Sequence, residues 1–143
     1  MSDKFFLDIN ILVYTFDSQA PVKQAKAHQL VAEALSRQQG IISYQVIQEF
    51  LNVATRKFAQ PLSHADCRLY LDRVLTPLCE VFPSVALYQT ALELAERWQY
   101  ALYDSLIIAA ALQSDCRTLY SEDLQHGQRI EAMLITNPFE AGR

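Results

Sequence analysis

The sequence predicts an α/β fold in which helices cover both faces of a central parallel sheet. Short apolar runs alternate along the chain with longer segments of helical period. The first run, residues 4–8, has consecutive apolar side chains, which indicates a strand that is buried on both faces. Helical segments of about ten or more residues between strands favour right-handed parallel crossovers. We therefore expect a three-layer α/β/α sandwich whose parallel sheet has four to five strands.

Turn and cap residues divide the chain into the elements of this sandwich. Pro21 suits the first turn of a helix, and Gly40 is expected to end that helix. Ser63 and Ser84 are predicted N-caps, since each directly precedes a segment of helical period. No linker or repeat interrupts the pattern, so residues 1–143 are expected to form one domain. Strands are expected at residues 4–8, 41–43, 80–82, 117–120 and 132–135, and helices at residues 21–39, 44–58, 63–75, 85–100 and 103–114.

Composition excludes several classes of protein. Hydrophobic residues make up 51% of the chain, which is enough for a real core, yet no apolar run approaches the length of a membrane span. The first residues do not resemble a secretory signal, so we expect a soluble, cytoplasmic protein without a membrane partner. Only three glycines occur, which rules out the glycine-rich loops of common nucleotide sites. The net charge of −4 argues against binding nucleic acid through a basic surface alone, but leaves room for binding through cations.

Acidic residues follow two of the predicted strands. Asp8 closes the first strand, and Ser121, Glu122 and Asp123 follow the fourth. Ligands of an open parallel sheet bind beyond the carboxyl ends of its strands, so these positions are candidates for a site. Asp123 also has an ordinary interpretation, because Ser-Glu-Asp is common in turns and at helix starts. Glu122 is expected to be the solvated neighbour.

Two further acids lie on predicted helices. Glu49 stands within a wide apolar stripe, where a carboxylate is costly to bury unless a cation or a donor meets it. The alternative is that Glu49 lies at the edge of the stripe and reaches water or pairs with Arg56. Asp104 opens a nearly all-apolar helix and shares a face with Ile107 and other buried positions. Its alternative is a capping or first-turn role.

Together, Asp8, Glu49, Asp104 and Asp123 predict a cluster of carboxylates at one edge of the sheet. Such a cluster needs cations, because neighbouring carboxylates cannot all ionise without compensation. Ligation by oxygen alone selects hard ions such as Mg²⁺ or Mn²⁺. Hard ions beside an open cleft suit the hydrolysis of phosphate esters, in which one metal activates water and another stabilises the leaving oxygen.

Four segments, in order and spacing, resemble the PIN-domain nucleases, and in particular the toxin subunits of VapBC-type toxin–antitoxin pairs. The matching segments cover essentially the whole chain and are FLDINILVY (residues 6–14), QEFLNV around Glu49, YDSLIIAAAL (residues 103–112) and TLYSEDL (residues 118–124). The resemblance implies an endoribonuclease that uses Mg²⁺ or Mn²⁺, cuts single-stranded or structured RNA and leaves a 5′-phosphate. It also implies a homodimer and, for a toxin, an antitoxin partner.

The resemblance implies a role for each candidate residue. Asp8 would be the central ligand, Glu49 and Asp104 would complete the first metal site, and Asp123 would serve a second metal or its waters. Asn10 would orient Asp8, and Ser121 would hydrogen-bond a carboxylate. Many family members carry a further acid where this chain has His126, for which we expect a turn-capping role rather than phosphate binding.

Substrate contacts and alternative functions are less specific. Arg56, Lys57 and Arg129 are candidates for phosphate contacts, and the alternative is a solvated surface. Tyr14, Tyr103 and Tyr120 adjoin the candidate ligands, and core packing is favoured over base stacking. An aspartyl-phosphate phosphatase is disfavoured because it needs a second Asp where this chain has Asn10. The remaining alternative is a PIN-like scaffold that binds RNA or protein without cutting.

Overall fold

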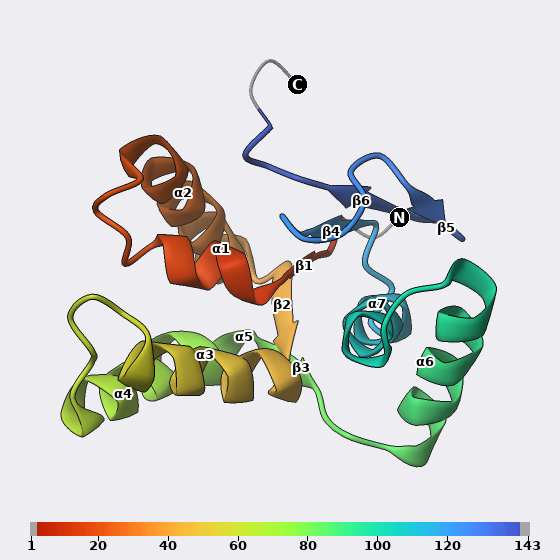
Figure 1. The fold of residues 1–143 in the computed structure, drawn as a ribbon, viewed down its shortest axis with the longest axis horizontal. Helices are drawn as coiled ribbons and strands as arrows, with labels where there is room; N and C mark the ends of the chain where they lie inside the picture. The colour runs from red at the N-terminus through yellow and green to blue at the C-terminus, as the bar shows by residue number, and fades with distance from the viewer. Residues whose placement is uncertain (1–2, 141–143) are drawn as a thin grey trace.

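A six-stranded sheet with helices on both faces forms the framework of the computed structural model, which describes residues 3–140. Figure 1 shows α1 and α2 on one side of the sheet and α6 and α7 on the other. The strands are β1 (Phe5–Leu7), β2 (Gly40–Ser43), β3 (Cys79–Val81), β4 (Thr118–Tyr120), β5 (Arg129–Ile130) and β6 (Met133–Thr136). The helices are α1 (Ile9–Tyr14), α2 (Pro21–Arg37), α3 (Tyr44–Arg56), α4 (His64–Tyr70), the π-helical turn η1 (Leu71–Leu75), α5 (Thr76–Leu78), α6 (Val85–Trp98) and α7 (Leu102–Gln113).

The sheet order is β3-β2-β1-β4-β6-β5, and every neighbouring pair is parallel except β5 with β6. The predicted α/β fold with helices on both faces is confirmed. The described sheet has one strand more than the four to five expected, because the antiparallel β5 has only two residues and too little pattern to detect. The order places β1 at the centre, where both of its faces are covered.

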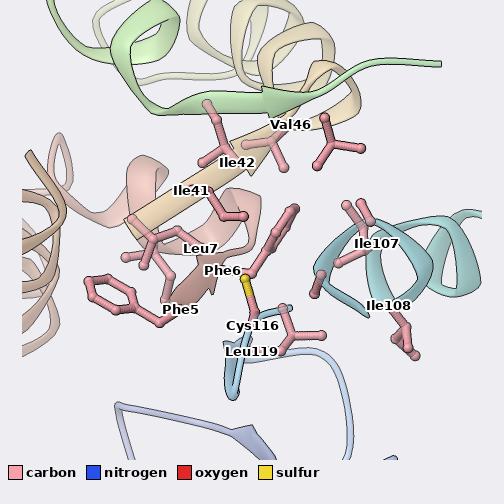
Figure 2. Close-up of a cluster of buried hydrophobic side chains, with 14 of the residues drawn as sticks. Phe5, Phe6, Leu7, Ile41, Ile42, Val46, Ile107, Ile108, Cys116 and Leu119 are labelled. Atoms are coloured by element: carbon pink, nitrogen blue, oxygen red, sulfur yellow. The ribbon is translucent and has the colours of Figure 1, made fainter. Parts of the chain in front are cut away.

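Side chains of β1 alternate between the two helical layers. Figure 2 shows Phe6 pointing toward α7 and Ile107, whereas Phe5 and Leu7 point to the opposite side. Phe6 and Leu7 are fully buried. Consecutive apolar residues are therefore required in this strand, since each face of the sheet meets a helix.

Several helix boundaries follow from local chemistry. The hydroxyls of Ser63 and Ser84 accept hydrogen bonds from the backbone N–H groups of Asp66 and Leu87, so both predicted caps are confirmed. Helix α1 was not predicted, because the short apolar run after Asp8 resembled a turn. Within residues 3–140, no helix is long and apolar enough to cross a membrane.

The prediction that Gly40 ends a helix was wrong. Helix α2 ends at Arg37, Gln38 takes the left-handed cap conformation with φ 56°, and Gly40 is the first residue of β2. A Cβ atom at position 40 would lie 2.1 Å from the Cβ of Ala34 and 2.8 Å from a ring carbon of Phe5. Glycine is needed here because α2 approaches β2 too closely to admit a side chain.

The buried side chains of α7 allow a test of its position in the fold. Ile108 is fully buried under the sheet, so Ile108→Val is expected to lower the free energy of unfolding by about 0.5–1.5 kcal/mol. The control Val22→Ala, at an exposed position of α2, is expected to change it by less than about 0.5 kcal/mol. Urea denaturation measures both values. An equal cost for the two variants would contradict the buried position of α7.

Candidate metal and active site

The carboxyl ends of β1 and β4 meet at Asp8. The two strands are parallel and in register, and the backbone N–H of Asp8 donates to the carbonyl of Tyr120 at 3.0 Å. The Asp8 side chain caps α1 by accepting a hydrogen bond from the N–H of Ile9 at 2.7 Å. The hydroxyl of Ser121, the first residue after β4, donates to the other Asp8 oxygen at 2.8 Å. Asp8 is thus fixed in place by three elements of the fold.

Burial makes Asp8 an unusual carboxylate. Only 7% of the residue is exposed, and its pKa is raised from the ordinary 3.8 to about 6. Burial is the largest cause of this rise; the hydrogen bonds from Ser121 and Ile9 oppose it, and the negative charges of Glu49 and Asp123 add to it. The Asp8 carboxylate is therefore ionised in surroundings that disfavour its charge.

Glu49 lies on α3 and takes a hydrogen bond from a buried amide. The Nε2 atom of Gln45 donates to Glu49 Oε1 at 2.9 Å and to the backbone carbonyl of Tyr103 at 3.2 Å. Glu49 is half-buried, and within residues 3–140 no ion pair joins it to Arg56. Gln45 was not singled out from the sequence, where it is one polar residue on a mixed helix.

Asp104 lies in the first turn of α7 but does not cap it, since the N-cap residue is Ala101. Its side chain is half-buried, and its pKa is raised first by burial and then by the charge of Asp123. Asp123 also raises the pKa of Asp8, as does Glu49. These interactions connect all four predicted acids into one electrostatic group.

Asn10 contacts a different acid from the one expected. Its Nδ2 atom donates to Asp123 Oδ2 at 2.9 Å, whereas the expectation was that Asn10 orients Asp8. The first turn of α1 lies beside the loop after β4, which brings Asn10 within reach of Asp123. Asp8 is oriented instead by Ser121 and Ile9.

Glu122 is not the solvated residue that the sequence analysis expected. Its two carboxylate oxygens accept hydrogen bonds from Tyr14 at 2.7 Å and from Lys23 at 2.6 Å. Lys23 also lies over the rings of Tyr14 and Phe139. This cluster ties the loop that carries Ser121 and Asp123 to α1 and α2. No sequence signal pointed to it, because Lys23 and Glu122 are 99 positions apart.

The three predicted phosphate contacts lie in two different parts of the fold. Arg56 and Lys57 are exposed at the end of α3, and Lys57 also lines a groove of about 560 Å³ with Phe16. In the sheet, Arg129 of β5 lies opposite Leu134 of β6, and Leu134 lies opposite Thr118 at the beginning of β4. Arg129 is therefore at the amino end of the parallel strands, away from the edge that carries Asp8.

The tyrosines beside the site differ from one another. Tyr120 packs edge-on against Phe5, and Tyr14 joins the Glu122 cluster. Tyr103 is 68% exposed, so core packing does not account for it. His126 accepts a hydrogen bond from the backbone N–H of Asn137 at 2.8 Å, which links the loop after β4 to the end of β6.

The donor set fits a hard divalent cation. All four acids supply oxygen, the type of ligand that Mg²⁺ and Mn²⁺ prefer. Among the described residues, the buried hydroxyls of Ser43, Tyr70 and Ser105 have no hydrogen-bond partner, and the first and last of these lie at the end of β2 and directly after Asp104. Among residues 3–140, no three acidic, histidine or cysteine side chains lie close enough to form a ready-made metal site. An ion would therefore have to draw the carboxylates inward.

Ser121 allows a test of how Asp8 is held. Ser121→Ala removes a buried donor to a carboxylate, so we expect the free energy of unfolding at pH 8 to fall by about 1.5 kcal/mol. Urea denaturation in EDTA measures this change. Ser18→Ala, at an exposed position, is the matched control and is expected to have no measurable effect. A cost for Ser121→Ala no greater than that of the control would show that the bond to Asp8 is unimportant.

Comparison with known proteins identifies a family model and several structural neighbours. The model of the PIN domain matches residues 5–129. A toxin–antitoxin complex from Klebsiella pneumoniae has a TM-score of 0.68 and 18% identity, with 96% of this chain and 99% of that chain covered. The sarcin–ricin loop cleaving toxin VapC20 of Mycobacterium tuberculosis has a TM-score of 0.62 and 17% identity, with 84% and 90% covered.

A third neighbour is the DNA-bound VapBC of Salmonella typhimurium. Its TM-score is 0.63 and its identity is 20%, with 94% of this chain and 97% of that chain covered. At these identities the likeness shows a shared fold and not a shared substrate. No curated protein sequence is similar enough to this chain to count as a relative.

Proposed function

Because the chain belongs to the PIN-domain family, we propose that it is a divalent-metal-dependent endoribonuclease and the toxin component of a toxin–antitoxin pair. The observation that carries this proposal is the electrostatic group formed by Asp8, Glu49, Asp104 and Asp123. Asp8, the central residue of this group, is buried and hydrogen-bonded, and its surroundings raise its pKa. A carboxyl group perturbed in this way is typical of a functional site, where a bound cation would stabilise its charge.

In this proposal Asp8 is the central metal ligand. Glu49 and Asp104 complete the first metal site, and Asp123 serves a second metal or its bound water. Divalent cations held by these carboxylates would supply the Lewis-acid chemistry that activates water and stabilises the leaving oxygen of an RNA phosphodiester. Ser121 and the N–H of Ile9 keep Asp8 in one orientation, and Asn10 does the same for Asp123. The protein's contribution is to hold the carboxylates in place. Without bound cations, these carboxylates would repel the phosphate of the substrate.

The proposal extends to partners and location. Neighbours of the same fold were crystallised as toxin–antitoxin complexes, which supports an antitoxin partner for this chain. We further propose one cytoplasmic domain that acts on RNA and forms a homodimer. Helix α6 supports the homodimer, because Val85, Tyr88 and Leu92 form an exposed apolar stripe along it.

The homodimer has a direct test. Leu92→Glu places a charge in the middle of the stripe, so we expect the variant to sediment as a monomer where the wild type sediments as a dimer. Glu93→Gln, an exposed neighbour on the same helix, is expected to leave the dimer intact. Sedimentation velocity of both variants decides the point. A wild type that is monomeric at every concentration would refute the proposed assembly.

The nuclease activity is tested by incubating purified protein, freed of any bound partner, with a labelled pool of structured RNA. Cleavage that occurs with Mg²⁺ or Mn²⁺, stops in EDTA and leaves 5′-phosphate ends is the expected result. The absence of cleavage with either metal would favour the alternative, a PIN-like scaffold that binds RNA or protein. If the protein then still bound RNA in EDTA, it would be a scaffold that binds RNA without metal.

A further inference from the structure

We infer that Gln45 is a positioning residue of the candidate metal site, because its side-chain amide links Glu49 to the first turn of α7, which carries Asp104. The inference rests on the proposed metal-dependent function. Gln45 is the second residue of α3, directly after the carboxyl end of β2, and is 6% exposed. Glutamine is uncommon at such a position unless its amide is fully used.

The orientation of the Gln45 amide is determined by its surroundings. Its two neighbours at hydrogen-bonding distance are the Glu49 carboxylate, at 2.9 Å, and the backbone carbonyl of Tyr103, at 3.2 Å. Both neighbours are hydrogen-bond acceptors, so the amide nitrogen faces them. Each of the two N–H bonds of this nitrogen therefore has its own acceptor.

These two bonds connect parts of the site that the chain itself keeps apart. Glu49 lies on α3, whereas Tyr103 immediately precedes Asp104 on α7, 54 residues farther along the chain than Glu49. The bond to Glu49 restricts its rotamers, and the bond to Tyr103 fixes the distance between α3 and the beginning of α7. Partners of this kind behind metal ligands determine how well the ligands are pre-organised.

A purely structural role is the competing explanation. Gln45 and Glu49 are four residues apart on one helix, a spacing at which polar side chains often pair without any function. That explanation accounts for the bond to Glu49 but gives no reason for a buried amide that also reaches across to α7. The two explanations differ in one observable, which is the affinity for metal.

The test compares Gln45→Met and Gln45→Asn with the wild type. Methionine keeps the length and suits the buried position but removes both donors, and asparagine keeps the amide but is too short to reach both acceptors. Gln48→Met is the matched control, because Gln48 is exposed on the same helix. Calorimetric titration with Mn²⁺ gives the binding constant of each protein, and RNA cleavage at increasing Mg²⁺ gives the half-saturating concentration and the rate at saturation.

We expect both Gln45 variants to bind Mn²⁺ about tenfold more weakly than the wild type, with Gln48→Met unchanged. The Mg²⁺ concentration at half-saturation should rise by the same factor, while the cleavage rate at saturating Mg²⁺ stays close to that of the wild type. Circular dichroism shows whether each variant is folded. If one Gln45 variant does not fold, the other still tests the inference.

Other outcomes overturn the inference in distinguishable ways. If both Gln45 variants lose thermal stability but bind Mn²⁺ like the wild type, the residue is structural and only this inference fails. A lower rate at saturating Mg²⁺ with unchanged Mn²⁺ affinity would also contradict it. If the wild type itself binds no Mn²⁺, the proposed function fails and the inference fails with it.

Discussion

Asp8→Asn is expected to reduce metal-dependent RNA cleavage by about 10³-fold or more. The substitution keeps the shape of the side chain but removes the charge at the centre of the four carboxylates. Metal catalysis contributes several kcal/mol, and each 1.36 kcal/mol corresponds to about tenfold in rate. The measurement is the initial rate of cleavage at saturating Mg²⁺.

Two controls make this result interpretable. Asp72→Asn, at an exposed position of η1, removes the same charge away from the site and is expected to cut like the wild type. Circular dichroism must show Asp8→Asn to be folded. Equal rates for Asp8→Asn and the wild type would mean that the chemistry takes place elsewhere.

The second large effect concerns stability in the absence of metal. Asp8 has a folded-state pKa of about 6, above its unfolded value of 3.8. The folded state therefore binds the proton more tightly, and stability falls as the pH rises from about 4 through about 6. The difference of about two pKa units corresponds to about 3 kcal/mol, lost in full above that range. The raised pKa of Asp104 acts in the same direction.

Asp8→Asn removes this penalty. In EDTA at pH 8 the variant is expected to be more stable than the wild type, by up to about 3 kcal/mol, and the difference should vanish toward pH 4. Urea denaturation at several pH values measures this difference. Added Mn²⁺ should stabilise the wild type and not the variant, because only the wild type keeps the central ligand. A difference that does not vary with pH would show that Asp8 is not under electrostatic strain.

Local chemistry in the sequence was enough to predict most of the fold. Consecutive apolar residues marked β1, and the serine caps at Ser63 and Ser84 marked the beginning of their helices. The elements that escaped prediction were short or context-dependent. Strand β5 has two residues, and α1 has six that follow directly from the Asp8 cap. Patterns of this length carry too few periods to distinguish a strand or helix from a turn.

Gly40 illustrates a second limit of sequence reasoning. Its position after a helical segment suggested a helix end, but its actual reason is the contact with Ala34 and Phe5. That contact depends on how α2 packs against the sheet, which a single sequence does not specify. The cap itself is made by Gln38, a residue that seldom adopts a positive φ.

In the candidate site, too, some features could be predicted from the sequence and others depend on how the chain packs. The acids could be located in the sequence because they follow strands or stand within apolar helices. The groups that hold them could not be located, since the Lys23–Glu122 pair and the Gln45–Tyr103 bond join residues far apart in the chain. The family resemblance assigned Asn10 to Asp8, whereas the fold brings its side chain to Asp123. Candidate acids can thus be picked out from the sequence, whereas the contacts that support them depend on tertiary packing.

A crystal structure with Mn²⁺, located by its anomalous scattering, tests directly whether Asp8 is a metal ligand. We expect a peak bonded to Asp8 at about 2.1 Å, with Glu49 and Asp104 among its other ligands or hydrogen-bonded to its waters. A Mn²⁺ ion bound elsewhere, with the Asp8 carboxylate still hydrogen-bonded only to Ser121 and Ile9, would show that Asp8 is not the central ligand.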